Sequence, residues 1–225
     1  MITPVLLVYW LSLLLYTPQG LFPAPGPGGR SPIGGGGDPP AFVGANGAAY
    51  DPFNTSRTVA LASVSGGNTV VVGYVGSNNI SSCSDDQANS YTVFNGAQVK
   101  FCFSFSVAGA ATLTTTVTLA SSNSNPGTLI AAHYSGTLTA KDADCAASSF
   151  TSNVTCTTGS ISVIPQLVIG VMSAAVTPTA GSDYTLRHTQ GNVKWEDMVT
   201  STTGTHVVNF SHAEATSSIQ GVTFQ

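Results

Sequence analysis

The chain has 225 residues, a formal net charge of −4 and only 7% charged residues, whereas an ordinary soluble domain has about 25%. This sparse and slightly acidic balance excludes partners that are held through basic residues and released counterions, such as nucleic acid. The length is enough for one large sandwich or barrel with a real core, and the abundance of Ser, Thr, Asn and Gly predicts an extracellular or cell-surface location.

Residues 5–16, VLLVYWLSLLLY, form an apolar run without a charge. Twelve residues are too few to span a membrane comfortably, and they fit the hydrophobic region of a signal peptide. However, no Lys or Arg precedes the run, and no A-x-A-like cleavage site follows it. Two interpretations of residues 1–22 therefore stay open: a cleaved signal peptide, or a retained segment that docks on another copy. The docking residues would be Val5, Leu6, Leu7, Val8, Tyr9, Trp10, Leu11, Leu13, Leu14 and Leu15.

Residues 23–47 are rich in Pro and Gly and predict an extended arm, because Pro lacks a backbone donor and Gly lacks stiffness. In polyproline geometry, at about 3.1 Å per residue, this arm spans on the order of 75 Å. An apolar segment on such an arm can add a strand to the sheet edge of another molecule. The sequence thus predicts three parts: segment 1–22, arm 23–47 and a β-sandwich domain at 48–225.

The domain reads as short strands with period-two alternation, separated by turn residues. The expected strands are Thr58–Val64, Thr69–Val75, Ser90–Phe94, Val99–Val107, Ala111–Ala120, Thr128–Tyr134, Ser160–Ile164, Gln166–Met172, Tyr184–His188, Val193–Thr200, Thr205–Ser211 and Ser218–Phe224. No internal repeat is visible in the sequence. About twelve strands imply an all-β fold with two antiparallel sheets packed face to face, in a jelly-roll or immunoglobulin-like manner.

Two strands are informative about their faces. In residues 99–107, Phe101, Phe103 and Phe105 alternate with Cys and Ser, and in residues 111–120 apolar residues alternate with Thr. We expect the Ser and Thr faces of both strands to be wet. Leu167–Met172 is apolar on both faces, which predicts a strand in the middle of a packed layer.

The four cysteines allow three pairings. Cys145 and Cys156 bracket one polar loop, and a bond between them would close it. Cys102 lies on the Ser face of its strand, where it can meet Cys83 in another polar loop. We therefore expect bonds 83–102 and 145–156. The chain has no C-x-x-C pair, so neither zinc nor any other cofactor is predicted.

Four N-x-S/T sequons are candidate acceptors for N-linked glycans: Asn54, Asn79, Asn153 and Asn209. In a chain this rich in Ser, Thr and Asn such matches also arise by chance, so the signal is weak. If the source is eukaryotic, Asn79 and Asn153 lie in expected loops and are the better candidates.

Five short stretches carry a resemblance: Asn68–Gly73, Asp86–Thr92, His133–Gly136, Asp183–Arg187 and Gly221–Gln225. Together they resemble a β-sandwich domain type that recurs in secreted and surface proteins of environmental bacteria. The chain departs from its pattern at Ala88, where the type has Gly, and at His133, where it has an acidic residue. The resemblance covers about residues 57–225. It implies an extracellular building block or binding module, and it implies no catalytic residues or substrate.

Candidate chemistry is sparse. Asp85 and Asp86 precede Asn89 in a loop that would suit calcium, but a turn bonded to its own backbone is favoured. Glu196 and Asp197 are adjacent on an expected strand, so they point to opposite faces and do not form a glycosidase pair by themselves. No G-x-S-x-G elbow is present, and we expect no enzyme.

Trp195 and Lys100 each have two interpretations. An exposed Trp195 would be a platform for stacking sugars, and a buried one would belong to the core. Lys100, next to Phe101, is the best of the three lysines for an isopeptide cross-link, although a plain lysine at a strand end is favoured.

The sequence favours an extracellular structural subunit that assembles with copies of itself into a filament, coat or surface layer, through its hydrophobic segment and arm. One alternative is a surface-anchored module for adhesion or carbohydrate binding. Another is a viral coat subunit. The expected partners are copies of the chain, with carbohydrate as the alternative and no nucleic-acid contact by the sandwich domain.

Overall fold

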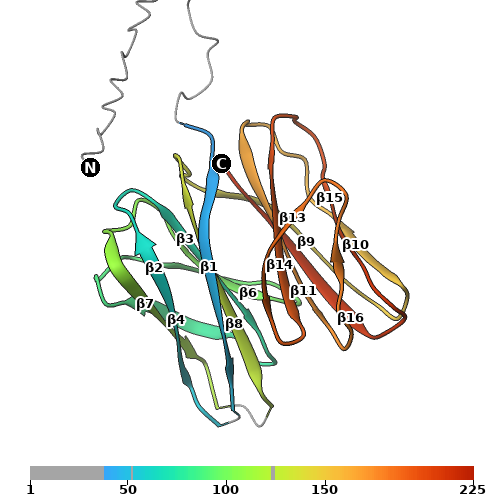
Figure 1. Ribbon diagram of the computed structural model, residues 1–225, viewed down its shortest axis with the longest axis horizontal. Helices are drawn as coiled ribbons and strands as arrows, with labels where there is room; N and C mark the ends of the chain where they lie inside the picture. Colours follow the sequence, from blue (N-terminus) through green and yellow to red (C-terminus); the bar gives the residue numbers. More distant parts are fainter. Residues whose placement is uncertain (1–37, 52, 123–124) are drawn as a thin grey trace, which may run out of the picture. The chain divides into compact units, whose positions relative to one another are not determined.

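The structure, a computed structural model, describes residues 38–51, 53–122 and 125–225 (Figure 1). The predicted segment 1–22 and most of the arm lie outside these residues. All regular elements in the described ranges are strands: β1 (Ala41–Tyr50), β2 (Ser56–Val64), β3 (Thr69–Val75), β4 (Ile80–Asp85), β5 (Thr92–Asn95), β6 (Lys100–Ser104), β7 (Ala110–Leu119), β8 (Gly127–Ser135), β9 (Lys141–Ser149), β10 (Asn153–Thr157), β11 (Gln166–Ala174), β12 (Thr179–Ala180), β13 (Thr185–Gln190), β14 (Val193–Thr200), β15 (Val207–Ser211) and β16 (Ser217–Phe224).

The strands form four antiparallel sheets that group into two lobes. Sheet A has the order β1-β8-β3-β6-β5 and sheet B the order β2-β7-β4, and together they make the N-terminal lobe. Sheet C, read from β9, has the order β9-β16-β11-β14-β13, and sheet D has β10-β15-β12; these make the C-terminal lobe. The predicted all-β fold with two-sheet antiparallel sandwich packing is confirmed, and it occurs once in each lobe.

The two lobes have the same topology. Each of the strands β1–β8 has a counterpart eight strands later, in the same place in its sheet. In each lobe the first strand pairs with the last, the second with the seventh and the third with the sixth, which is the jelly-roll arrangement. The fifth strand pairs with the sixth, and in the N-terminal lobe the Asn95 side chain joins it to the fourth. The amide of Asn95 donates to the Ile80 carbonyl at 3.1 Å and accepts the Ile80 N–H at 2.8 Å.

Three apolar cores hold the sheets in the layer order B–A–C–D. One core lies between sheets A and B, and another between sheets C and D. The third lies between sheets A and C and contains Phe101 and Phe103 from one lobe and Trp195 and Phe224 from the other. The inner strands of sheets A and C are therefore buried on both faces, whereas sheets B and D keep one face toward solvent.

The order of the layers determines which of the faces that were predicted to be wet is exposed to solvent. The prediction is wrong for β6, where Cys102 and Ser104 are buried because sheet B covers that face. It is correct for β7, where Leu113 and Val117 point inward while Thr114, Thr116 and Thr118 are partly exposed; Thr115, in phase with the apolar residues, is buried. The prediction for β11 is also correct, since its two faces contribute to two different cores.

Several strands were not expected. β1 takes in residues 41–47, so the sandwich begins inside the predicted arm rather than at 48. Glycine there allows close packing: a Cβ at Gly44 would lie 2.8 Å from His133 Nε2, and one at Gly47 would lie 2.8 Å from Gln190 Cβ. The polar stretches expected as cysteine loops form β4, β9 and β10, and β12 was also missed. The expected strand Ser160–Ile164 is wrong, because only Ile161 makes a bridge, with Gly204.

Candidate functional site

The predicted cysteine pairs are both formed. Cys83 bonds Cys102, and Cys145 bonds Cys156. The first bond joins β4 of sheet B to β6 of sheet A, and the second joins β9 of sheet C to β10 of sheet D. Each lobe therefore has one covalent link between its outer and inner sheet. Such bonds form and persist in oxidising compartments.

The predicted docking residues Val5–Leu15 lie outside the described residues. The four sequons all fall on or next to the outer sheets. Asn54 precedes β2 and Asn79 precedes β4, and both are exposed. Asn153 is exposed on β10, and Asn209 is partly buried on β15, where Thr155 pairs with it. The structure thus leaves Asn54, Asn79 and Asn153 accessible for modification.

Trp195 is a core residue, which corrects its interpretation as a sugar platform. Its side chain is 0% exposed, because sheet A covers the face of β14 on which it lies. The ring packs edge-on against Phe101 at 6.3 Å between centroids. A sugar therefore cannot stack on it without opening the two lobes.

Trp195 also belongs to a buried polar network between the lobes. Its indole N–H donates to the Tyr134 hydroxyl at 3.0 Å, and that hydroxyl donates to Asp197 Oδ2 at 2.9 Å. Arg187 donates its Nε–H to Asp197 Oδ1 at 2.8 Å. Burial raises the pKa of the Asp197 carboxyl, while the bonds from Arg187 and Tyr134 oppose that rise. The network satisfies polar groups inside an apolar core and fixes one lobe against the other.

Glu196 faces the other way, as its adjacency to Asp197 predicts. It is 0% exposed, and its Oε2 accepts the Gly181 N–H at 3.0 Å. Its Oε1 has no hydrogen-bond partner in the part of the chain that the structure describes. Burial raises the pKa of Glu196 to about 8, so this carboxyl is mostly protonated at neutral pH. Sequence reasoning predicted that the residue points away from Asp197, but it could not foresee its burial.

A pocket of about 290 Å³ lies in the C-terminal lobe. It is lined by Asp183, Met198, Val199, Thr200, Ser201, Thr202 and His206. β13 pairs with β14 only as far as Asp197, so residues 198–200 of β14 are unpaired on that side. Sequence reasoning missed this pocket, because it depends on where one strand stops and not on a residue pattern.

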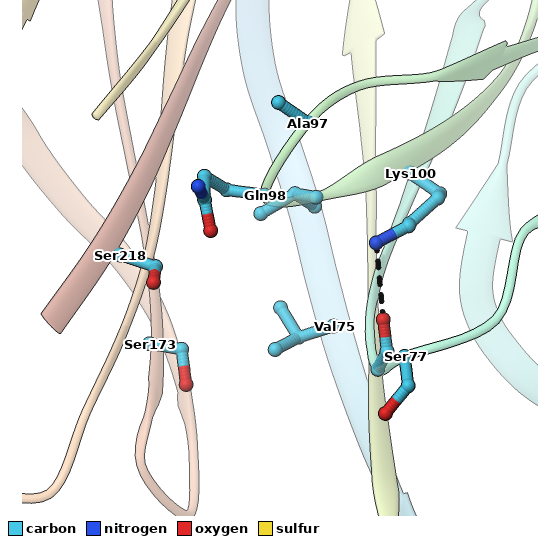
Figure 2. A pocket seen from close by; sticks show the side chains of 9 residues that line it. Val75, Ser77, Ala97, Gln98, Lys100, Ser173 and Ser218 are labelled. Carbon is cyan, nitrogen blue, oxygen red and sulfur yellow. Dashed lines mark hydrogen bonds between the residues drawn. The ribbon is translucent and has the colours of Figure 1, made fainter. Parts of the chain in front are cut away.

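A second pocket, of about 420 Å³, lies where the two lobes meet at one end of their inner sheets (Figure 2). Ser173 and Ser218 line it from the C-terminal lobe, and Val75, Gln98 and Lys100 from the N-terminal lobe. The Lys100 ammonium donates to the Gly76 carbonyl at 3.1 Å, and burial lowers its pKa. The favoured interpretation of Lys100 as a lysine at a strand end agrees with its place at the start of β6.

The acidic loop at residues 85–89 is a self-bonded turn, as favoured. Asp85 Oδ1 accepts the backbone N–H groups of Gln87 and Asn89, at 2.9 and 3.0 Å. Its Oδ2 accepts from the Asn89 amide and the Tyr91 hydroxyl. These donors occupy the oxygens that a calcium ion would need. Across the described ranges, no group of three or more His, Cys, Asp or Glu side chains is arranged to hold a metal.

No helix in the described residues is long and apolar enough to cross a membrane. Comparison with protein-family models, curated proteins and solved structures finds no significant match to this chain. The resemblance to the bacterial surface-domain type therefore stays a prediction.

Proposed function

We propose that the protein is an extracellular structural subunit that assembles with copies of itself into a filament, coat or surface layer. Residues 1–22 and the arm that follows make the subunit contact. The proposal rests on the apolar run in the sequence and on the surface that the folded body presents.

The observation that carries the proposal is the chemistry of the two outer faces. On sheet B the outward residues are Ser56, Thr58, Ala60, Ser82, Ser84, Thr114, Thr116 and Thr118, and on sheet D they are Asn153, Thr155, Thr157, Thr179, Val207, Asn209 and Ser211. These faces carry hydroxyls, amides and methyl groups but no charge. Copies can pack against them without burying an ionised group, which would cost several kcal/mol.

The body also has the durability that a structural role requires. Three cores hold four layers together, and each lobe has one disulfide between its sheets. The disulfides support an extracellular location, since cytosolic thiols are kept reduced.

Deletion of residues 1–22 tests the proposal. We expect the full chain to form polymers in electron microscopy and sedimentation velocity, and the deleted protein to remain a folded monomer with an unchanged circular dichroism spectrum. The reason is that the deletion removes all ten predicted docking residues and none of the described strands. Polymers that are unchanged after the deletion would contradict the proposed role.

A coat subunit of a closed particle is the second candidate. The observation in its favour is the jelly-roll topology of both lobes, an arrangement that occurs in viral capsid proteins as well as in lectin domains and cupins. This argument is one of fold alone, and fold does not determine function. Electron microscopy separates the two candidates, because a coat subunit forms shells of uniform diameter and a filament subunit forms fibres.

A further inference from the structure

The outer sheet of the C-terminal lobe is shorter than its counterpart in the N-terminal lobe. In sheet B, β4 has six residues and pairs with β7 from Thr115 to Leu119. In sheet D, β12 has two residues and pairs with β15 only at Phe210 and Ser211. Among the residues that the structure describes, no strand pairs with Val207–Asn209 on the side of β12. Gly181 lies against Asn209 on that side, so the open strand edge of β15 is at Val207 and Val208.

The early end of β12 is set by specific contacts. Gly181, the next residue, donates its N–H to the buried Glu196 and not to β15. Gly181 also packs so close to β15 that a Cβ would lie 2.6 Å from Asn209 Oδ1. The Tyr184 N–H then bonds the Gly181 carbonyl at 3.0 Å, which closes a turn. The chain is thus turned away from β15 at a fixed point.

The space that β12 leaves free adjoins the 290 Å³ pocket. If β12 continued in register, residues 182 and 183 would lie opposite Val208 and Val207. Instead, Asp183 and His206 line the pocket, together with Val199 and with Met198, which packs on the core of the lobe. Val199 and Val207 are 45% and 49% exposed, which is unusual for valines on strands. We call the open edge at Val207 and Val208 and this pocket the β15 slot.

We infer that the β15 slot accepts residues 5–16 of a neighbouring copy as an added strand. The inference rests on the proposed function and names the acceptor for its docking segment. Strand addition would supply backbone hydrogen bonds to β15, while alternate side chains of the added strand would enter the pocket.

The chemistry of the segment matches the slot. Residues 5–16 carry no charge, and Val5, Val8, Tyr9 and Trp10 are residue types that favour strands. The indole N–H of Trp10 or the hydroxyl of Tyr9 can donate to Asp183, the one carboxylate among the residues that line the pocket. Residues 17–40 join the segment to β1 and span on the order of 75 Å when extended, so the segment can reach another molecule.

Cross-linking between two variants, each with one introduced free cysteine, tests the contact. Full-length Leu11→Cys protein is mixed with full-length Val207→Cys protein, treated with a short bismaleimide and analysed by mass spectrometry. We expect a peptide that joins residue 11 of one copy to residue 207 of the other. The matched control is Val43→Cys, since Val43 is 47% exposed on β1 but lies in the other lobe; it should give no such product. Equal cross-linking at both positions, or none at residue 207, overturns the inference.

A charge in the slot tests its contribution to assembly. Because burying an unpaired carboxylate costs more than about 1.4 kcal/mol, Val199→Asp, which puts a charge among the residues that line the pocket, should weaken association at least about tenfold, whereas Val43→Asp should leave it unchanged. Thr202→Asp provides a second slot variant if Val199→Asp does not fold.

The outcomes separate the two proposals. If the 1–22 deletion gives monomers while the slot variants polymerise like the wild type, the slot is wrong and the proposed function stands. If the deleted protein still polymerises, the proposed function fails. If a Leu11→Cys/Val207→Cys double variant cross-links only within one chain, the slot is filled by its own segment and the intermolecular contact is overturned.

Discussion

At the scale of single residues, Glu196 and Asp197 show how much about a buried site can be predicted from the sequence. Alternation along a strand is enough to predict that the two carboxyls face opposite ways, and the structure has them in two different cores. Their environments could not be predicted, because Tyr134 and Gly181 are distant in sequence and meet them only through the packing of the lobes.

Glu196 makes the free energy of unfolding depend on pH, and one substitution should remove this dependence. The pKa of this carboxyl is about 8 in the folded protein against 4.5 for the ordinary group. Between these values the unfolded chain loses a proton that the folded chain keeps, so the free energy of unfolding falls as pH rises, by up to about 5 kcal/mol. In Glu196→Gln this fall should be absent when urea unfolding is measured from pH 4 to 9.

The control is Glu214→Gln, which changes the only other glutamate in the chain, an exposed one. It should keep the wild-type pH profile. A Glu196→Gln profile parallel to that of the wild type would show that this carboxyl ionises normally in the fold.

Tyr134 is the central member of the inter-lobe network, so removal of its hydroxyl should lower the stability of the fold. Tyr134→Phe leaves the Trp195 N–H without its acceptor and Asp197 without one donor, both inside the core. We expect a loss of about 3 kcal/mol in the free energy of unfolding. Tyr91→Phe, which removes a partly buried hydroxyl that donates to Asp85, should cost about 1 kcal/mol. Equal losses in thermal or urea unfolding would argue against the network.

At the scale of strands and sheets, the sequence predicts best where turn residues mark the start of a strand. β3 and β14 have the expected bounds, since Gly67 and Gly191, both with positive φ, lie just before them. β4, β9 and β10 consist largely of Ser, Thr, Ala, Asn, Asp and Cys, a composition that predicts loops. Their strand structure comes from pairing with β7, β16 and β15, and from the disulfides, which local propensity does not report.

The two disulfides should each stabilise their own lobe. They close loops with sequence separations of 19 and 11 residues, for which chain entropy predicts about 3 kcal/mol each. We expect Cys83→Ala/Cys102→Ala and Cys145→Ala/Cys156→Ala to lower the free energy of guanidinium unfolding by about that amount. A negligible loss in either double variant would mean that the sheets of that lobe are held by packing alone.

At the scale of the whole folded body, the sequence predicts the class of fold but not its duplication. The two lobes share their topology without a visible sequence repeat, because many apolar patterns can fill the same sheet positions. The face-to-face packing of sheets A and C was also unforeseen. It buries Thr69, on the same face as Val71, whereas Ser104 and His133 are buried on the face toward sheet B; the sequence alone would place all three near solvent.

Because the two lobes share a core, they should unfold together. Trp195 lies between them and is the only tryptophan left when residues 1–22 are removed. In that deleted protein we expect the thermal transitions followed by tryptophan fluorescence and by far-ultraviolet circular dichroism to coincide. Two separated transitions would mean that each jelly roll is stable without the other.

The contacts between the inner sheets obey a two-fold relation. Arg187 on β13 lies over the Phe42 ring of β1 at 4.6 Å, and Lys141 on β9 lies over the Phe94 ring of β5 at 4.2 Å. The counterpart of β1 is β9 and that of β5 is β13, so the contact between β13 and β1 corresponds to the contact between β5 and β9. This is the geometry of an isologous homodimer, written into a single polypeptide. Within this two-fold frame the outer sheets differ, because β4 has six residues and its counterpart β12 has two.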